Sequence, residues 1–248
     1  MMKSIAYIFV VLVTLWECLW SLPLESLVAN RTIIAFGDSL TEGMYISTDP
    51  NDKFGFHSYA LQLQKRLNGT DAYVSQKGKS GARATELMYD FPTILKAKRR
   101  TDPIFVIILA GTNDLGARLS HSTIVWHLKK IHNAVQHHSL SIKKNIYTIA
   151  IGIPEISWPI KQSDRIKSNE EMKEYAEKCF KTVSYISLET QFNQTVPENR
   201  YLWSKDMVHF SRQGYNKMGD IIYDKMKEFA VSKTEDSLVS MDIDSICT

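Results

Sequence analysis

Short apolar runs alternate with longer amphipathic segments from residue 31 onward. The strongest run is 104–110 (IFVIILA), and its unbroken apolar character predicts a strand that is buried on both faces. Four further runs of β-type composition lie at 32–36, 72–75, 146–151 and 183–186. Between and after these runs, hydrophobic residues recur at helical spacing in five segments, 57–67, 85–89, 120–137, 169–180 and 211–230. The pattern therefore predicts five strands separated by helices.

Strands that alternate with helices indicate right-handed crossovers and a parallel sheet covered on both faces. We therefore expect an α/β fold, a three-layer α/β/α sandwich around a doubly wound parallel sheet of about five strands. Residues 22–230 would form this single domain. Residues 231–248 lose the periodicity and are rich in acidic side chains, so we interpret them as a flexible acidic tail.

The first residues have the features of a targeting segment. Lys3 precedes the uncharged apolar run 5–16, and Glu17 interrupts that run before it reaches the length of about 20 residues that a membrane span needs. We interpret 1–21 as a cleaved secretory signal, with cleavage between Cys18 and Asn30; an uncleaved anchor is the alternative.

Three N-x-[ST] triplets follow the leader, at Asn30, Asn68 and Asn193. Beside a signal peptide they predict a secreted, extracellular glycoprotein. Only Cys179 and Cys247 would remain after cleavage, and they could pair in an oxidising compartment, although the sequence gives no geometry for that pairing.

Composition and charge exclude several classes of protein. The chain has 248 residues, 44% hydrophobic and 23% charged, which is ordinary for a globular protein and excludes disorder, collagen and coiled coil. Thirty basic and 27 acidic residues are interspersed, so nucleic acid is not indicated as a partner. Three cysteines are too few for a disulfide scaffold or a Cys-rich zinc site. We interpret the histidines between 121 and 138 as a solvated helix face rather than a metal site, because no acidic or cysteine ligand set accompanies them in sequence.

The candidate chemistry lies where strands end, the edge at which open α/β sheets bind ligands. Residues 37–41 (GDSLT), 78–81 (GKSG) and 111–114 (GTND) each follow a predicted strand, and 206–209 (DMVH) precedes the last predicted helix. A serine, a histidine with an acid three residues before it, and two donor-rich loops are the parts that acyl transfer requires.

Each part also has an ordinary structural interpretation. Ser39 could cap a helix, and Asp206 with His209 could cap the final helix just as well as form a catalytic pair. Gly81 and Asn113 could supply a backbone N–H and a side-chain amide, yet loops commonly contain both residue types. Asp38, like Asp114, is interpreted as a loop organiser. Trp158 and Trp203 could line a substrate pocket or pack in the interior, and the 44–56 and 153–168 loops that could shape such a pocket carry no recognisable motif.

Taken together, the four blocks resemble those of the SGNH hydrolases, also called the GDSL esterase/lipase family. Residues 36–43 (FGDSLTEG) are close to a full match to the family's nucleophile block, and the other three blocks follow in the family's order. The resemblance runs from about residue 32 to 228. The block at 78–81, called the glycine loop below, departs from the family pattern because Lys77, Lys79 and Arg83 surround it with positive charge. Gly81 is the first candidate for the backbone N–H that binds the oxyanion, and Gly78 is the second.

The resemblance implies a flavodoxin-like SGNH hydrolase fold and a serine esterase mechanism. Ser39 would be the nucleophile, His209 the base and Asp206 the residue that orients His209. The oxyanion would be bound by Ser39, Gly81 and Asn113, and neither a metal nor an organic cofactor would be needed. The expected activity is hydrolysis of a carboxylic ester, a lipid, an acetylated glycan or a small acyl ester, through an acyl-enzyme intermediate. The alternative is a catalytically silent protein that uses this fold to bind carbohydrate or lipid. Transient contact with a membrane or lipid surface is left open.

Overall fold

The computed structural model describes residues 24–47, 53–97 and 101–236. Its centre is a five-stranded sheet in the order β4-β1-β5-β6-β7, and every neighbouring pair is parallel. The strands are β1 (Thr32–Gly37), β4 (Tyr73–Gly78), β5 (Pro103–Leu109), β6 (Tyr147–Ile151) and β7 (Val183–Ile186). All five predicted strands are therefore present, and β4 runs three residues past its predicted end.

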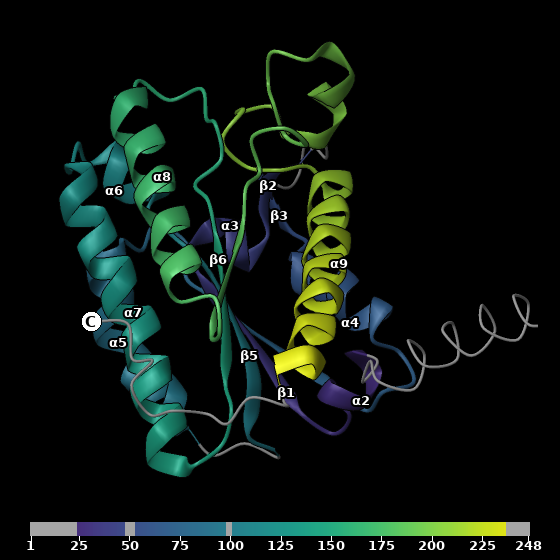
Figure 1. Cartoon of the computed structure of the whole chain (residues 1–248). Coiled ribbons are helices and arrows are strands. Elements are labelled where there is room, and N and C mark those ends of the chain that lie inside the picture. Colours follow the sequence, from purple (N-terminus) through teal and green to yellow (C-terminus); the bar gives the residue numbers. More distant parts are fainter. Residues whose placement is uncertain (1–23, 48–52, 98–100, 237–248) are drawn as a thin grey trace, which may run out of the picture.

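Helices cover both faces of the sheet and bury one hydrophobic cluster on each side (Figure 1). One face carries α2 (Leu24–Val28), α4 (Tyr59–Arg66) and α9 (Arg212–Asp236), and the other carries α5 (Ala84–Lys96), α7 (His121–Ile142) and α8 (Gln162–Lys178). Successive residues of β1 point to opposite clusters, Ile33 into the first and Ile34 into the second. The expected three-layer α/β/α sandwich is confirmed.

Four helices extend beyond their predicted limits, among them α7, which continues to Ile142, five residues past its predicted end. Helix α5 continues to Lys96 with Pro92 inside it, and α8 begins at Gln162, seven residues before the prediction. The first turns of α8 escape detection because their buried side chains are polar: Arg165, for example, bonds the Ile153 carbonyl oxygen and the Glu189 carboxylate. Helix α9 continues to Asp236, so its last six residues occupy the start of the segment predicted to be a tail.

The remaining predictions about the chain ends lie outside the described residues. These are the leader 1–21, the rest of the tail, and Cys247. Cys179 is buried at the end of α8, and its pairing with Cys247 stays a prediction. Among the described helices, none combines the length and the hydrophobicity that crossing a membrane requires.

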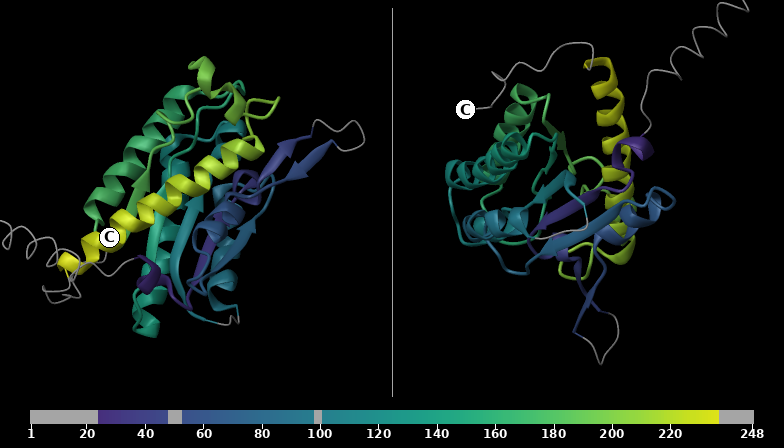
Figure 2. Two further views of the ribbon diagram at one scale, coloured as in Figure 1. Left: turned by 90° about the vertical axis from the view of Figure 1, so that its right-hand side faces the viewer. Right: turned by 90° about the horizontal axis from the view of Figure 1, so that it is seen from below.

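A β-hairpin occupies part of the segment 44–56 that was predicted to be a loop, so this prediction is wrong for the two ends of the segment. Strands β2 (Met44–Ile46) and β3 (Phe54–Phe56) pair antiparallel. Both views of Figure 2 show this hairpin extending away from the body of the molecule. It was not predicted because its strands are three residues long and its apolar residues do not lead into the core.

Short helices occupy the carboxyl ends of the central strands. Helix α3 (Ser39–Glu42) follows β1, and α6 (Thr112–Gly116) follows β5. Gly37 is required at the end of β1, because a Cβ there would lie 1.9 Å from the Leu109 carbonyl oxygen of β5. The 3-10 helix η1 (Pro197–Leu202) precedes the segment that contains Asp206 and His209.

Candidate active site

Ser39 is placed by the turn between β1 and α3. Asp38 is the N-cap of α3, and its Oδ1 accepts a hydrogen bond from the Leu40 N–H at 2.9 Å. Ser39 is thereby fixed as the first residue of a one-turn helix at the carboxyl end of β1, with 7% of its surface exposed.

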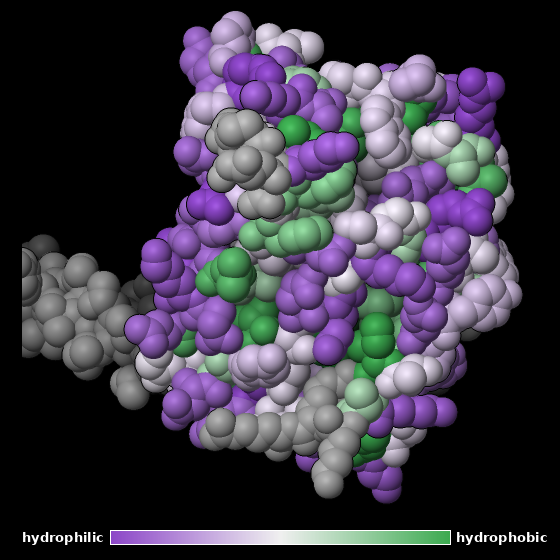
Figure 3. All heavy atoms as spheres, turned by 180° about the vertical axis from the view of Figure 1, so that it is seen from behind, coloured by the Kyte–Doolittle hydropathy of each residue, from purple (hydrophilic) through white to green (hydrophobic). Residues whose placement is uncertain are grey.

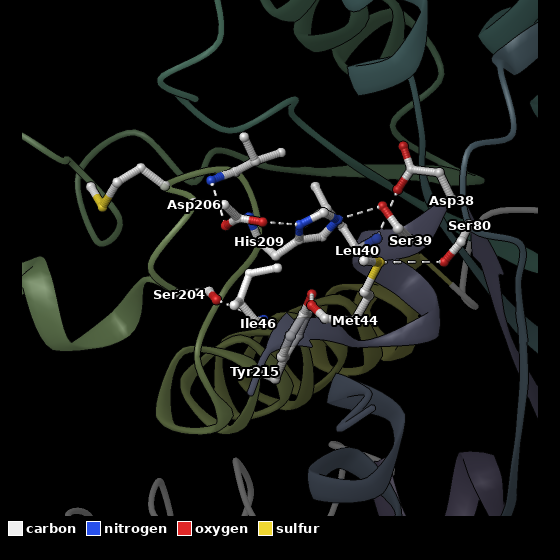
Figure 4. A network of polar contacts seen from close by, with 12 residues as sticks. Asp38, Ser39, Leu40, Met44, Ile46, Ser80, Ser204, Asp206, His209 and Tyr215 are labelled. Atoms are coloured by element: carbon white, nitrogen blue, oxygen red, sulfur yellow. Dashed lines mark hydrogen bonds and ion pairs between the residues drawn. The ribbon is translucent and has the colours of Figure 1, made fainter. Parts of the chain in front are cut away.

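A chain of hydrogen bonds joins Ser39 to His209 and Asp206 (Figure 4). The Oγ of Ser39 lies 2.9 Å from Nε2 of His209, and Nδ1 of His209 lies 2.7 Å from Oδ2 of Asp206. The second carboxylate oxygen of Asp206 accepts the backbone N–H groups of Val208 and His209, each at 3.1 Å. The three residues that the sequence singled out therefore lie in one line, although 167 residues separate Ser39 from Asp206 in the chain.

The surroundings of Asp206 favour its charged form. Burial by itself would raise the pKa of this carboxyl, but the hydrogen bonds from the His209 ring and from two backbone N–H groups outweigh burial and lower the pKa below its usual value. An ionised Asp206 accepts a hydrogen bond from the N–H at Nδ1 of His209, which leaves the lone pair of Nε2 for the Ser39 hydroxyl. In this arrangement Ser39 donates and Nε2 accepts.

Three candidate hydrogen-bond donors lie just beyond the carboxyl ends of neighbouring strands. The backbone N–H of Ser39 is at the N-terminus of α3, and Gly81 occupies the loop after β4 with φ +78°. Neither N–H donates to another described residue. Asn113, at the start of α6, donates one amide hydrogen to the Ala82 carbonyl oxygen at 2.9 Å, so its second amide hydrogen is available.

The structure distinguishes the two glycines of this loop. Gly78 ends β4, and a Cβ at this position would lie 2.2 Å from the Glu42 nitrogen, so close packing against α3 explains the glycine. Gly81 has open space around its Cα, with nothing within 4 Å of an added Cβ. The glycine at position 81 is not explained by packing, and its N–H donates to no described residue, so Gly81 stays the first candidate donor.

Glu42 is the residue of this region that sequence reasoning missed. Its Oε2 accepts the Ser80 backbone N–H at 2.9 Å and the Ser80 hydroxyl as well, so the last residue of α3 anchors the glycine loop. Glu42 lies inside the FGDSLTEG block, but its partner is 38 residues away in the chain, and nothing in the sequence connects the two.

The positive charge around the glycine loop is largely neutralised by α5. Lys79 Nζ lies 2.9 Å from Asp90, and Arg83 lies 3.4 Å from Glu86. Both pairs are exposed, so they add little to stability. The charge that departs from the family pattern therefore does not create a concentrated cationic site.

Asp38 and Asp114 act as loop organisers in the structure. Asp114 Oδ2 accepts the Ala84 N–H at 2.8 Å and so holds the start of α5. Burial raises the pKa of Asp114, and it raises the pKa of Asp38 to about 7. The second oxygen of the Asp38 carboxyl is buried and has no hydrogen-bond partner among the described residues.

The histidines of α7 do not share one environment. The expectation of a solvated face is wrong for His132, which is buried with Nδ1 2.8 Å from Thr148 Oγ1; burial lowers its pKa to about 3. His121 contacts Asp164 at 3.1 Å and Glu171 at 3.3 Å, acidic neighbours that the sequence did not reveal. Within the described ranges, no group of three or more His, Cys, Asp or Glu side chains could hold a metal ion.

The two tryptophans have different environments. Trp203 is buried against Phe192 and Phe210, so it is a packing residue. Trp158 is 39% exposed and lies against α6, where a Cβ on Gly116 would be 2.9 Å from its ring.

Comparisons with known proteins identify the family and the fold of this chain. The sequence model of the GDSL-like lipase/acylhydrolase family matches residues 35–217. No curated protein sequence matches the chain. Among solved structures, the carbohydrate acetylesterase Est24 from Sinorhizobium meliloti superimposes with a TM-score of 0.62 at 18% identity, covering 79% of this chain and 97% of Est24.

Two further solved structures share the fold. The aryl esterase of M. smegmatis has a TM-score of 0.63 at 16% identity, over 80% of this chain and 99% of that enzyme. The lipase/acylhydrolase from Enterococcus faecalis has a TM-score of 0.59 at 19% identity, over 80% of this chain and 96% of that one. At these identities the superpositions establish the fold, and the match to the family rests on the sequence.

Proposed function

Because the chain belongs to the GDSL-like lipase/acylhydrolase family and is a carboxylic ester hydrolase, we propose that it is a secreted serine esterase in which Ser39, His209 and Asp206 form the catalytic triad. The observation that carries the proposal is the 2.9 Å contact between Ser39 Oγ and His209 Nε2, with Asp206 on the opposite nitrogen. Nucleophile, base and orienting carboxylate in hydrogen-bond reach are what nucleophilic catalysis requires.

The reaction proceeds in two halves. Ser39 Oγ attacks the ester carbonyl carbon while its proton passes to His209 Nε2, and the carbonyl electron pair moves onto oxygen. The tetrahedral intermediate collapses, the bond to the alcohol oxygen breaks, and His209 returns the proton to that alcohol. Water then attacks the acyl-enzyme with His209 as the base, and the carboxylic acid leaves with Ser39 regenerated.

The developing oxyanion is bound by the N–H groups of Ser39 and Gly81 and by the Asn113 amide. The bond from Asn113 to the Ala82 carbonyl oxygen supports this role, because it fixes the amide beside the glycine loop. Loss of one such donor typically costs on the order of 10²–10³ in kcat.

The substrates are carboxylic esters, and the fold does not indicate which ester is hydrolysed. The superimposed structures include a carbohydrate acetylesterase, an aryl esterase and a lipase/acylhydrolase, so one scaffold serves different esters. Secretion is proposed from the apolar leader within 1–21 and from the three glycosylation triplets.

A fluorophosphonate probe tests the nucleophile directly. The wild type should be labelled at Ser39 and should hydrolyse p-nitrophenyl acetate, whereas Ser39→Ala should lose labelling and at least about a thousandfold in kcat. Ser122→Ala is the control, because Ser122 is an exposed serine on α7 whose hydroxyl bonds Ser120.

Two outcomes would overturn the proposal. Labelling that persists in Ser39→Ala would place the nucleophile elsewhere. A correctly folded wild type that neither reacts with the probe nor hydrolyses any ester would favour the catalytically silent binding protein.

A further inference from the structure

The β2–β3 hairpin has two faces of different character. Strand register pairs Met44 with Phe56 and Ile46 with Phe54, so these four side chains lie on one face. We call them the apolar hairpin face. Tyr45 pairs with Gly55 on the opposite face.

The Tyr45 face is packed against the protein. The guanidinium of Arg212 lies 5.2 Å from the Tyr45 ring centroid, and Arg212 Nε donates to Tyr45 Oη at 2.9 Å. A Cβ on Gly55 would lie 2.2 Å from the Tyr45 ring, so the glycine makes room for it. Tyr215 of α9 also donates to the Met44 carbonyl oxygen at 2.6 Å. The hairpin is therefore firmly attached to α9 by one face.

The apolar hairpin face begins at the candidate active site. Met44 Sδ lies 3.9 Å from Ser80 Oγ, directly beside Gly81. The Ile46 N–H donates to Ser204 Oγ at 2.8 Å, and the Ser204 N–H donates to the His209 carbonyl oxygen at 2.8 Å. Figure 4 shows the Met44 and Ile46 side chains on the side of β2 that faces Ser39 and His209. Strand β2 therefore contacts both the glycine loop, through Ser80, and the segment that contains His209, through Ser204.

The outer part of this face is uncovered. Phe54 is 50% exposed and Phe56 is 59% exposed, an unusual pair of large apolar side chains in neighbouring positions of one face. Figure 3 shows the molecule from behind, where hydrophobic residues form small groups among hydrophilic ones, and the exposed fractions of Phe54 and Phe56 identify the uncovered part of the hairpin face. Two successive cross-strand pairs extend about 7 Å along the strands, so the uncovered strip leads outward from the catalytic serine.

We propose that the apolar hairpin face binds the hydrocarbon chain of the ester substrate, and this proposal rests on the proposed esterase function. A chain attached to a carbonyl or alkoxy group at Ser39 would continue along Met44 and Phe56 to Ile46 and Phe54. Two other occupants fit less well. Four side chains make a smaller surface than a stable protein interface buries. Residues 48–52 (TDPND), which lie between the two strands in the sequence, are polar and acidic, and this composition disfavours insertion of the segment into a lipid bilayer.

The chain can belong to either half of the ester, so the experiment has two arms. In the acyl arm, kcat/KM is measured for p-nitrophenyl acetate, butyrate and octanoate. In the alcohol arm, it is measured for ethyl, butyl and octyl acetate. Each arm compares the wild type with the double variant Phe54→Ser/Phe56→Ser. Tyr73→Ser is the matched control, because Tyr73 is an aromatic residue 61% exposed at the start of β4, at the opposite end of that strand from the glycine loop.

In one arm the wild type should have a higher kcat/KM for the longest chain than for the shortest. In the double variant the ratio of these two kcat/KM values should be about tenfold lower. Tyr73→Ser should keep the wild-type ratio. The arm that responds identifies the half of the ester that binds. A wild type that hydrolyses esters but shows no chain preference in either arm, or a preference that the double variant retains in full, would overturn the inference and leave the triad intact. Loss of fluorophosphonate labelling at Ser39 would instead indicate failure of the proposed function. Thermal unfolding of each variant shows whether it is folded.

Discussion

Asp206 shows how a single side chain sets the chemistry of its neighbour. Its lowered pKa keeps it charged through the pH range in which an esterase works, and that charge holds the Nδ1 proton of His209. Asp206→Asn should therefore lower kcat by the order of a thousandfold or more, because an amide nitrogen facing Nδ1 stabilises the wrong tautomer. Steady-state kinetics on p-nitrophenyl acetate measure this, with Asp224→Asn, an exposed carboxylate on α9, as the control. A variant with near-normal kcat would remove Asp206 from the triad.

Asp38 gives a second prediction at the residue scale, about stability. Burial raises its pKa from 3.8 to about 7, so the folded state holds a proton that the unfolded state releases between those values. The contribution of Asp38 to folding is therefore complete below about pH 4 and is lost as the pH rises towards 7. One pKa unit corresponds to about 1.4 kcal/mol, so the loss is at most roughly 4 kcal/mol.

Asp38→Asn removes this dependence while its side-chain oxygen can still accept from the Leu40 N–H. From pH 4 to pH 8 the free energy of unfolding of the wild type should therefore fall relative to that of the variant. Urea unfolding at both pH values measures it. A difference that stays constant across this range would show that Asp38 does not titrate there.

The structure brings together residues that the sequence singled out, and for three of them the reason is their position after a strand. Ser39, Gly81 and Asn113 come directly after strands whose ends share one edge, so the topology brings them together. Asp206 and His209 lie within reach of each other in a single turn. Glu42 could not be found in this way, since its role depends on a contact with Ser80 that only the folded chain creates.

At the scale of elements, the contact between α3 and the glycine loop supports a prediction about Glu42. Glu42→Ala should lower kcat about tenfold with little change in KM, because the loop that carries Gly81 loses its anchor and the oxyanion donor is less well positioned. Glu42→Gln should restore much of the rate, since its amide oxygen can accept from the Ser80 N–H.

Glu228→Ala is the control for the loss of a carboxylate, because Glu228 is exposed on α9 and pairs only with Lys225 among the described ion pairs. Equal loss of kcat in the alanine and glutamine variants would argue against an anchoring role. A large rise in KM alone would instead place Glu42 in substrate binding.

Most elements were predictable where burial is apolar and were not where it is polar or absent; α5 is the exception, because its second half buries Phe91 and Leu95 around Pro92 and was still not predicted. Strand β5 is buried at every position and gave the clearest pattern, whereas the start of α8 is held by Arg165 and Asn169 hydrogen bonds that leave no hydrophobic stripe. The β2–β3 hairpin was not predicted because Phe54 and Phe56 face outward.

At the scale of the whole molecule, the candidate active site and two of the glycosylation triplets lie at opposite ends of the strands. The strands' carboxyl ends carry Ser39 and the donor loops. The opposite end carries the glycosylation triplets at Asn30 and Asn68, which are exposed and adjacent: the Asn30 N–H donates to the Thr70 carbonyl oxygen at 3.2 Å, just before Thr32 and Tyr73 pair in the sheet. Six residues of β1 separate them from the site, a distance of about 20 Å. The third triplet differs, because Asn193 is half-buried and its side-chain oxygen accepts from Thr195.

We therefore expect glycans at Asn30 and Asn68 that leave catalysis unchanged. Expressed with its leader in eukaryotic cells, the protein should appear in the medium, and Asn30→Gln and Asn68→Gln should each reduce its mass by one glycan without altering kcat/KM. Thr70→Ser is the control, because it keeps both the triplet and a hydroxyl that can donate to the Leu67 carbonyl oxygen. A fall in kcat/KM on removing either glycan would contradict the separation of the two ends. A product that stays in the cells, with residues 1–21 attached and no change in mass after glycosidase treatment, would contradict secretion itself and favour the uncleaved anchor.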